Sequence, residues 1–233
     1  MAFLPSATAA FTSNPSLFLP NKKSISLAYT TPFQISELQA GAMAISYSSS
    51  QYNTGFAITN LGTSIYRETT AFISFAKAFL NGQLSLGINL SLRQINVQNY
   101  GGYITHGMDV GFSYYPNQWL GFHTAINNFN HPKLGRYQNE IPLRYSSGVN
   151  ILAEENAVLV AGLEKESGYA PTFLFGILYQ ATRQISLSSS WCTNPSTPSI
   201  GLLINLSPFS FIYTFKYNFN LSYTHIWGFS ATF

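Results

Sequence analysis

Apolar and polar residues alternate with a period of two along most of the chain. In QLSLGINLSLR (83–93), Leu or Ile occupies every even position, and small, polar or charged residues occupy the odd ones. Because successive side chains of a strand point to opposite faces, this pattern predicts a β-strand with one apolar face. Similar alternation predicts fourteen strands, at about 24–31, 38–48, 52–61, 67–80, 83–98, 103–115, 118–127, 142–152, 156–166, 171–181, 184–192, 199–207, 209–217 and 220–233.

The connections between these strands predict an up-and-down topology. Every second connection is tight, at 48–51, 80–83, 115–118, 153–156, 181–184 and 206–209. The connections between them are expected to be longer or looser, the longest being 128–142. Short turns at one end and longer loops at the other are typical of membrane β-barrels, and an even strand count places both chain ends at the short-turn end.

Composition favours a membrane barrel over a soluble domain. Charged residues make up 8% of the 233 residues and aromatic residues 16%, whereas about a quarter of the residues in soluble domains are charged. No apolar run approaches the roughly 18 residues of a membrane helix, and the mean hydropathy is only +0.08. The remaining way to satisfy backbone polar groups in lipid is a closed barrel.

We therefore expect an all-β, antiparallel, up-and-down transmembrane β-barrel over residues 23–233. Residues 1–22 are expected to form a short N-terminal plug or a disordered tail. They lack the basic start and full apolar core of a signal peptide, so the N-terminus is expected to be truncated. The alternative fold is a soluble β-sandwich that binds an apolar ligand.

The charge and motif content argues against several functions. Lys22 and Lys23 form the only adjacent basic pair, so the sequence has no basic patch of the kind that binds nucleic acid. The single cysteine, Cys192, excludes an internal disulfide and a cysteine-cluster metal site. No metal-binding, phosphate-binding or nucleophile motif is present. The chain is therefore expected to be no enzyme and to use no cofactor or metal.

Strand parity assigns one face of each strand to the barrel lumen, and most of its residues are small, which predicts a narrow or filled lumen. Its ionisable or amide side chains are candidates for a site, because a charge at membrane depth is costly unless it is paired or wetted. Two interpretations remain open, a structural network and contacts with a ligand. The candidates are Asn89, Arg93, Asp109, Arg144 and Glu164.

The chain ends in LSYTHIWGFSATF, whose alternate positions include Tyr223, Trp227, Phe229 and the terminal Phe233, with His225 interrupting the apolar face. This ending resembles the assembly signal of bacterial outer-membrane barrels. The resemblance implies that outer-membrane lipid and the barrel-assembly machinery are partners. It also implies a location in the outer membrane of a diderm bacterium.

A second resemblance covers most of the chain. SATAAFTSNPSLF, with Asn14-Pro15 as a plug turn, and the later segments YRETTAFISFAKAFLNGQLSLGINLSL and SSSWCTNPSTPSIGLLINL resemble the FadL-like outer-membrane barrels, especially the PorV/PorQ branch. The resemblance implies fourteen strands. It favours a non-enzymatic accessory of type IX protein secretion, whose partners would be secretion proteins contacting the 128–142 loop, with Lys133, Arg136 and Glu140. The alternative within this superfamily is a channel for hydrophobic small molecules.

Overall fold

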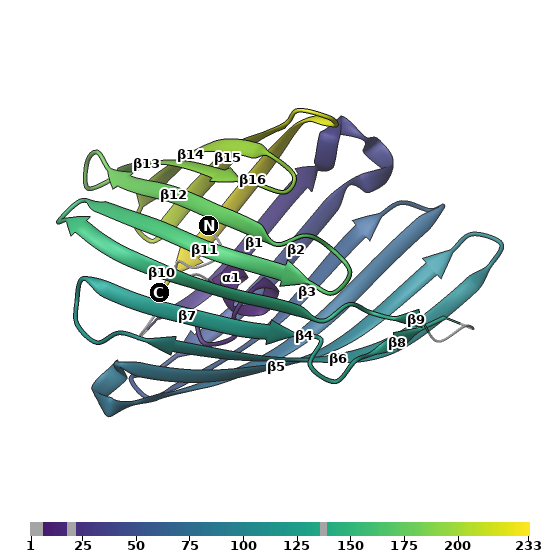
Figure 1. Ribbon diagram of the computed structural model, residues 1–233, viewed down its shortest axis with the longest axis horizontal. Coiled ribbons are helices and arrows are strands. Elements are labelled where there is room, and N and C mark those ends of the chain that lie inside the picture. Colours follow the sequence, from purple (N-terminus) through teal and green to yellow (C-terminus); the bar gives the residue numbers. More distant parts are fainter. Residues whose placement is uncertain (1–6, 18–21, 136–138) are drawn as a thin grey trace.

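The computed structural model is a closed barrel of fourteen antiparallel strands (Figure 1). The structure describes residues 7–17, 22–135 and 139–233. The first half of the wall contains β1 (Lys23–Thr31), β2 (Ala40–Ser48), β3 (Tyr52–Gly62), β4 (Tyr66–Phe79), β5 (Leu84–Val97), β6 (Gly101–Tyr114) and β7 (Leu120–Asn127). The second half contains β10 (Arg144–Glu154), β11 (Ala157–Glu166), β12 (Thr172–Gln180), β13 (Ile185–Cys192), β14 (Thr197–Leu206), β15 (Phe209–Asn218) and β16 (Ser222–Thr232).

Pairing between the first and last strands closes the barrel. Ser26 of β1 lies opposite Ser230 of β16 in the antiparallel ladder. At its end, the Lys23 N–H donates to the Phe233 carbonyl at 3.0 Å, and the Phe233 N–H donates to the Lys23 carbonyl at 2.8 Å. Each wall strand therefore has two neighbours, although β6 pairs with β7 only over Val110–Tyr114. This architecture confirms the predicted fold class and strand count and excludes the β-sandwich alternative.

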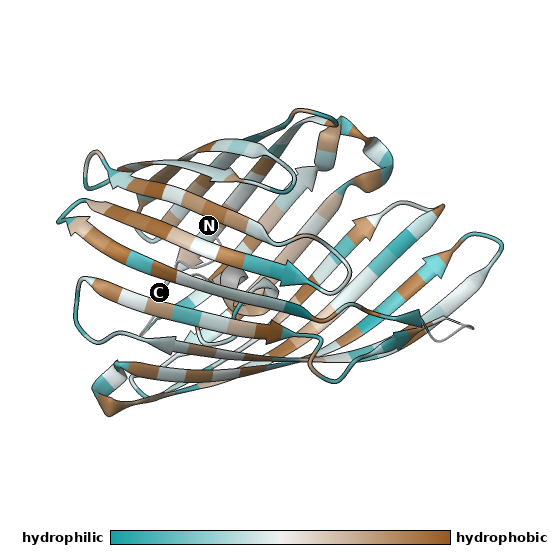
Figure 2. Cartoon of the chain, in the orientation of Figure 1, coloured by the Kyte–Doolittle hydropathy of each residue, from teal (hydrophilic) through white to brown (hydrophobic). Residues whose placement is uncertain are grey.

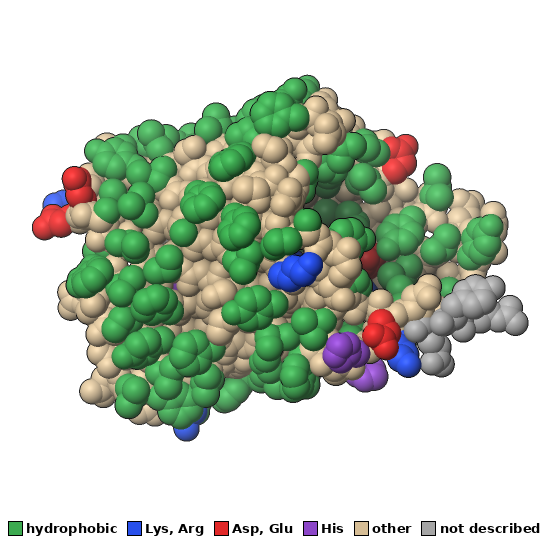
Figure 3. All heavy atoms as spheres, viewed as in Figure 1, with side chains coloured by type: hydrophobic (Ala, Val, Ile, Leu, Met, Phe, Trp, Pro, Cys, Tyr) green, Lys and Arg blue, Asp and Glu red, His purple; other side chains and the backbone are tan. Residues whose placement is uncertain are grey.

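The two faces of the wall differ in side-chain size and polarity. Figure 2 shows apolar and polar residues alternating along the strands. On the outer face, large apolar side chains are widely exposed, including Ile73 (62%), Leu92 (56%) and Trp227 (56%), and hydrophobic groups are spread over the face visible in Figure 3. A water-facing surface rarely carries so much contiguous apolar area. The outer face therefore suits contact with lipid acyl chains.

The connections are less sharply sorted by length than the sequence predicts. The turn end has short connections such as 155–156 and 207–208. At the other end, here called the loop end, residues 128–143 form a long connection, but 63–65 and 219–221 are as short as many turns. The connection between the strands expected over 52–61 and 67–80, which was expected to be one of the longer ones, is therefore short, because β3 and β4 continue pairing as far as Gly62 and Arg67.

A few short elements complete the chain. The long connection carries a small hairpin of β8 (Lys133–Leu134) and β9 (Asn139–Glu140), which the sequence analysis does not predict. The short 3₁₀ turns are η1 (Pro32–Gln34), η2 (Ser36–Leu38) and η3 (Leu80–Gly82). Within the described parts of the chain, no helix is long and apolar enough to cross a membrane.

The N-terminal residues 7–17, here called the luminal segment, lie inside the barrel. They begin with helix α1 (Ala7–Thr12), which Figure 1 shows within the ring of strands. The helix ends shortly before Asn14-Pro15, because proline disfavours a helical backbone in the residue that precedes it. Ala10 and Phe11 of the segment pack in one buried cluster with small wall residues, namely Ala44, Ala57 and Ala76. Small inward side chains therefore leave the room that the segment fills.

Candidate functional site in the lumen

The end of α1 is held by amide donors of the barrel wall. The last carbonyl groups of a helix have no partner within the helix, and α1 has only six residues. The side-chain amide of Asn89, on β5, donates to the carbonyl of Ala10 at 3.0 Å and to that of Phe11 at 3.2 Å. Asn89 is fully buried. This amide therefore fixes the helix against the wall.

The next two carbonyl groups of the luminal segment are also bonded to the wall. Arg144, at the start of β10, donates from Nη2 to the carbonyl of Thr12 at 2.8 Å. Asn127, at the end of β7, donates from Nδ2 to the carbonyl of Ser13 at 3.3 Å. A guanidinium group at the C-terminal end of a helix also interacts favourably with the helix dipole. Four consecutive carbonyl groups of the segment thus have donors from three strands.

The Asn14-Pro15 turn docks directly onto the wall. The Asn14 amide donates to the carbonyl groups of Phe112 (3.2 Å) and Thr124 (3.1 Å), which belong to neighbouring strands. Its Oδ1 accepts hydrogen bonds from the backbone N–H and the hydroxyl of Ser16. Asn14 is 1% exposed. The turn is therefore an anchor that joins distant parts of the chain.

Two strand glycines make this close approach possible. A Cβ atom on Gly111 would lie 2.0 Å from Asn14 Oδ1, and one on Gly87 would lie 2.3 Å from the Pro15 carbonyl oxygen. Real Cβ atoms do not come so near to other heavy atoms. Glycine in a strand interior often marks a place where another backbone comes close. Gly87 and Gly111 therefore form the seat of the luminal segment.

A chain of polar side chains extends from the segment across the wall. The hydroxyls of Ser16 and Ser113 lie 2.5 Å apart, and the Ser113 hydroxyl lies 3.0 Å from His123 Nδ1. On its other side, His123 Nε2 lies 3.0 Å from the Asn150 amide nitrogen. His123 is 2% exposed. This network ties the segment to β6, β7 and β10 without any solvent contact at its centre.

A hollow of about 300 Å³ lies between the luminal segment and the loop end. Its apolar lining comes from Phe11 of the segment, Phe72 of β4, and Ile141 and Pro142 of the long connection. Phe72 also packs against the cluster that contains Phe11. Phe11 and Phe72 therefore form an apolar floor, whereas Ile141 and Pro142 line the hollow from the long connection. Figure 3 shows the molecule hollowed at the loop end of the visible face.

Charged side chains also line the same hollow, namely Glu68, Arg93, Asp109, Arg144 and Glu166. Arg93 Nε lies 3.1 Å from Glu68 Oε1, an ion pair by distance although the N–H is not aligned for a hydrogen bond. Asp109 Oδ1 accepts the backbone N–H of Asn128 at 2.9 Å. Arg144 Nε donates to the side-chain oxygen of Asn127 at 3.2 Å. Each of these contacts is made within the protein, which agrees with the structural interpretation of the lumen charges.

The five lumen candidates differ in their position relative to the hollow. Arg93, Asp109 and Arg144 line the hollow, and Asn89 lies beneath it against α1. Glu164 lies opposite Ser146 on the luminal face of β11 and does not line the hollow. Their roles as site residues remain proposals.

Sequence reasoning missed two charged residues of the hollow, Glu68 and Glu166. Glu68 lies within the strand expected over 67–80 and Glu166 ends the strand expected over 156–166, but neither was assigned to the lumen. Glu68 lies on the same face of β4 as Thr70 and Phe72, so applying the luminal parity to the start of that strand would have found it. Glu166 lies opposite Arg144 in the ladder, and continuing the parity of β11 would have found it.

The residues of the expected assembly signal lie on the outer face of β16 or at its end. Tyr223, Trp227 and Phe229 share a face and lie opposite Tyr217, Tyr213 and Phe211 of β15, respectively. Phe229 stacks on Phe209 with ring centroids 5.7 Å apart. Phe233 follows the strand and is 67% exposed. Recognition of these residues by an assembly machinery stays a prediction.

Comparison with known proteins finds similarity in fold. No family model matches the chain and no curated protein matches it. The toluene transporter TodX of Pseudomonas putida is 10% identical with a TM-score of 0.66, covering 98% of this chain and 93% of that chain. The monoaromatic hydrocarbon channel CymD is 13% identical with a TM-score of 0.69, covering 99% and 93%. A FadL homologue of Pseudomonas aeruginosa is 10% identical with a TM-score of 0.63, covering 100% and 95%.

The chain thus has the fold of outer-membrane channels of the FadL type. At such low identity the likeness concerns the arrangement of strands and no individual site residue. The closed barrel and its apolar outer face identify an outer-membrane-type β-barrel.

Proposed function

We propose that this protein is a channel for small, largely apolar molecules in the outer membrane of a diderm bacterium. The observation that carries the proposal is the hollow at the loop end, which leads to an apolar floor of Phe11 and Phe72 above the docked luminal segment. The fold similarity to a toluene transporter and a monoaromatic hydrocarbon channel supports it.

The size of the hollow suits a molecule with one aromatic ring. An apolar protein cavity of about 150 Å³ is sufficient to bind benzene, and this hollow measures about 300 Å³. Threonines 12, 59 and 70 add methyl groups to the lining. Glu68, Arg93, Asp109 and Arg144 of the lining are engaged in contacts within the protein, so an uncharged ligand would meet the apolar floor without displacing an ion pair.

The luminal segment occupies part of the lumen, which distinguishes this channel from an open aqueous pore. Its hydrogen bonds anchor it to β5, β6, β7 and β10. On the opposite wall, the luminal face of β12–β14 carries small residues, namely Gly176, Ser188, Ser190 and Gly201, together with Leu174, Leu178 and Leu203. The proposed route of passage runs between the segment and this uncharged wall.

Uptake by cells tests the proposal. The chain is expressed in a diderm host that lacks hydrocarbon channels of its own, and the initial uptake rates of radiolabelled toluene and of a labelled disaccharide are compared with those of a vector control. We expect faster toluene uptake and unchanged disaccharide uptake. Equal toluene uptake in both strains would contradict the proposal, and faster disaccharide uptake would indicate an open pore.

The role of Phe72 gives a matched test of the binding step. Phe72→Asn places a polar amide on the apolar floor and should weaken the binding of toluene to the detergent-solubilised protein. Ile73→Asn, its neighbour on the outer face, should leave this affinity unchanged. Equal effects of the two substitutions would place the binding site elsewhere.

The role as an accessory of type IX secretion rests on the sequence resemblance alone, and none of the structural similarities reported above supports it. In the loop assigned to partner contacts, Lys133 and Glu140 belong to the β8–β9 hairpin, and Arg136 lies outside the described residues. Recovery of secretion proteins with the purified barrel would be the observation in favour of that role.

A further inference from the structure

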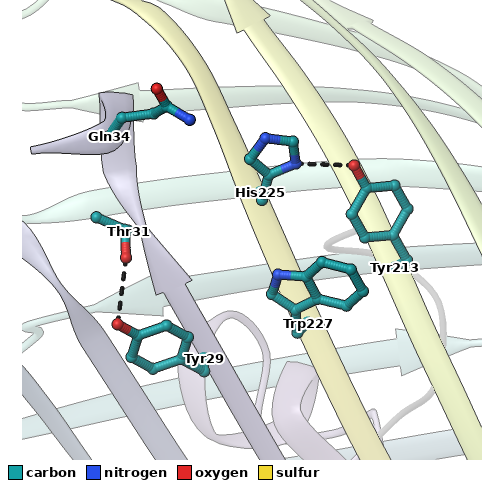
Figure 4. Close-up of a pocket in the computed structure, with 6 residues that line it drawn as sticks. All are labelled: Tyr29, Thr31, Gln34, Tyr213, His225 and Trp227. Carbon is teal, nitrogen blue, oxygen red and sulfur yellow. Dashed lines mark hydrogen bonds between the residues drawn. The ribbon is translucent and has the colours of Figure 1, made fainter.

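A second pocket lies on the outer face of the barrel, away from the lumen. It has a volume of about 420 Å³ and lies at the loop end, where β1, β15 and β16 run side by side. Tyr29, Thr31, Gln34, Tyr213, His225 and Trp227 line it (Figure 4). Because these strands close the barrel, the pocket lies over the seam between the first and last strands.

The walls of the pocket are aromatic rings with ordered contacts. Tyr29 and Trp227 lie opposite each other across the β1–β16 ladder. The rings of Tyr213 and Trp227 have centroids 4.5 Å apart, and the Tyr213 hydroxyl lies 2.8 Å from His225 Nδ1. These contacts fix the orientation of the Tyr213, His225 and Trp227 rings that border the pocket (Figure 4).

Polar atoms point into this space. In Figure 4 the second ring nitrogen of His225 faces the side of Gln34, and the indole nitrogen of Trp227 faces the side of Thr31 and Tyr29. The Thr31 hydroxyl donates to the Tyr29 hydroxyl at 3.3 Å. Indole N–H groups usually have an acceptor when they are removed from water. The pocket thus offers hydrogen-bonding groups between two aromatic faces.

The backbone above the pocket is held in an uncommon conformation. Phe33 and Gln34 have φ angles of 55° and 60°, values that non-glycine residues adopt in only a few per cent of cases. The Phe33 N–H donates to Thr224 Oγ1 of β16 at 2.9 Å, which fixes η1 against the seam. Such outliers persist when the surroundings determine them and are concentrated at binding sites. Here the outlier positions the Gln34 amide over the pocket.

We propose that this pocket binds the uncharged, hydroxyl-bearing headgroup of a lipid in the leaflet at the loop end. None of the described residues that line it is Asp, Glu, Lys or Arg, so nothing in the lining selects a charged head. Aromatic residues at the end of a membrane strand lie at headgroup level. Below the pocket, the outward side chains of Leu27 and Phe229 lie opposite each other and offer an apolar surface for the acyl chains.

The occupant is therefore an amphiphile with a sugar-like head between the aromatic faces and acyl chains along the seam. Its hydroxyl groups would accept the Trp227 N–H and meet the Gln34 amide and the free nitrogen of His225. The site is separate from the lumen, so the proposal stands independently of the channel function.

Fluorescence quenching of Trp227 tests the proposal. Trp119→Phe and Trp191→Phe leave Trp227 as the single indole, and the protein is placed in phosphatidylcholine nanodiscs containing increasing fractions of a glucosyl diacylglycerol brominated in its acyl chains. The matched control retains Trp191 instead. Trp191 also lies on the outer face at the loop end, but its N–H already donates to Ser196 at 3.1 Å and it lines no pocket described here.

Saturable quenching of Trp227 at a low fraction of the glycolipid is expected, whereas Trp191 quenching should rise linearly. Unbrominated glycolipid should displace the probe, and phosphatidylglycerol should not. Gln34→Ala removes one expected hydrogen bond to the headgroup, and Tyr213→Phe removes the bond that orients His225. Each should weaken the binding about fivefold, with heat-modifiable gel mobility showing that both variants are folded. Linear quenching of both indoles, or equal displacement by phosphatidylglycerol, would overturn the proposal.

Discussion

Asn89 has no exposed surface although it lies in the wall of a wide barrel. Its amide donates to two carbonyl groups at the end of a helix that is too short to be stable alone. These two hydrogen bonds explain why an asparagine stands at position 89, because its side-chain amide carries two N–H donors. At the residue scale, two of the lumen candidates, Asn89 and Arg144, are therefore best explained by attachment of the luminal segment.

The substitution Asn89→Leu tests that explanation. It removes both donors, leaves the Ala10 and Phe11 carbonyls unsatisfied, and should destabilise docking by about 1–3 kcal/mol. Hydrogen exchange of residues 7–17 should then become faster, while the gel mobility of the unheated barrel stays that of a folded protein. Asn205→Leu, on the luminal face of β14, is the matched control and should leave exchange of the segment unchanged. Equal exchange in both variants would exclude Asn89 as the anchor.

Asp109 gives a second prediction at this scale. Its carboxylate holds the backbone N–H of Asn128 and is attracted by the charge of Arg144. Asp109→Asn keeps an acceptor oxygen but loses the charge, so it should lower the unfolding midpoint more than it lowers toluene uptake. Thermal unfolding and uptake are measured on the same preparation. Normal unfolding with lost uptake would instead show that Asp109 contacts the transported molecule.

At the scale of elements, period-two alternation predicts the strands because each has one lipid-facing and one luminal face. The strand expected at 67–80, for example, is Tyr66–Phe79. The β8–β9 hairpin could not be predicted, because strands of two residues are too short to show a period-two pattern. Docking of the luminal segment also could not be predicted, since Asn14 contacts carbonyl groups 98 and 110 residues away and no local pattern encodes such a pairing.

The fit between β6 and the luminal segment leads to a prediction for Gly111. A methyl group there would overlap Asn14 Oδ1, so Gly111→Ala should displace the segment at a cost of about 1–3 kcal/mol while the strand keeps its place. We expect higher single-channel conductance in planar bilayers, because the displaced segment no longer fills the lumen.

The matched control for this prediction is Gly176→Ala, on the luminal face of the opposite wall. A Cβ atom there would lie 3.2 Å from Ser190 Cβ and near no atom of the segment. Its conductance should equal that of the unaltered protein. If Gly111→Ala also has unaltered conductance, the segment does not close the lumen.

At the scale of the whole molecule, the account depends on closure of the sheet between β1 and β16. Closure gives every wall strand a hydrogen-bonded neighbour on each side, although β6 pairs with β7 only over Val110–Tyr114, and it separates an apolar outer face from a small and polar inner one. The alternation, the composition and the connections predicted this architecture, and the resemblances agree with it. Both the proposed channel and the proposed lipid site need closure, since the first uses the lumen and the second lies on the seam.

A disulfide across the seam is the most direct test of closure. Ser26→Cys and Ser230→Cys place two thiols at opposed positions of β1 and β16, within the Cα separation of about 4.4–6.8 Å that a disulfide requires. Cys192→Ser removes the native thiol. The control pairs Ser26→Cys with Thr224→Cys, six residues further along β16 and therefore about 20 Å away.

Mild oxidation of the membrane-inserted protein, followed by denaturing non-reducing electrophoresis, gives the answer. The account predicts that the Ser26/Ser230 pair forms an intramolecular crosslink with altered mobility, reversed by reductant, and that the control pair does not. Free thiols in both proteins after oxidation would show that the first and last strands are apart, and would contradict the closed barrel.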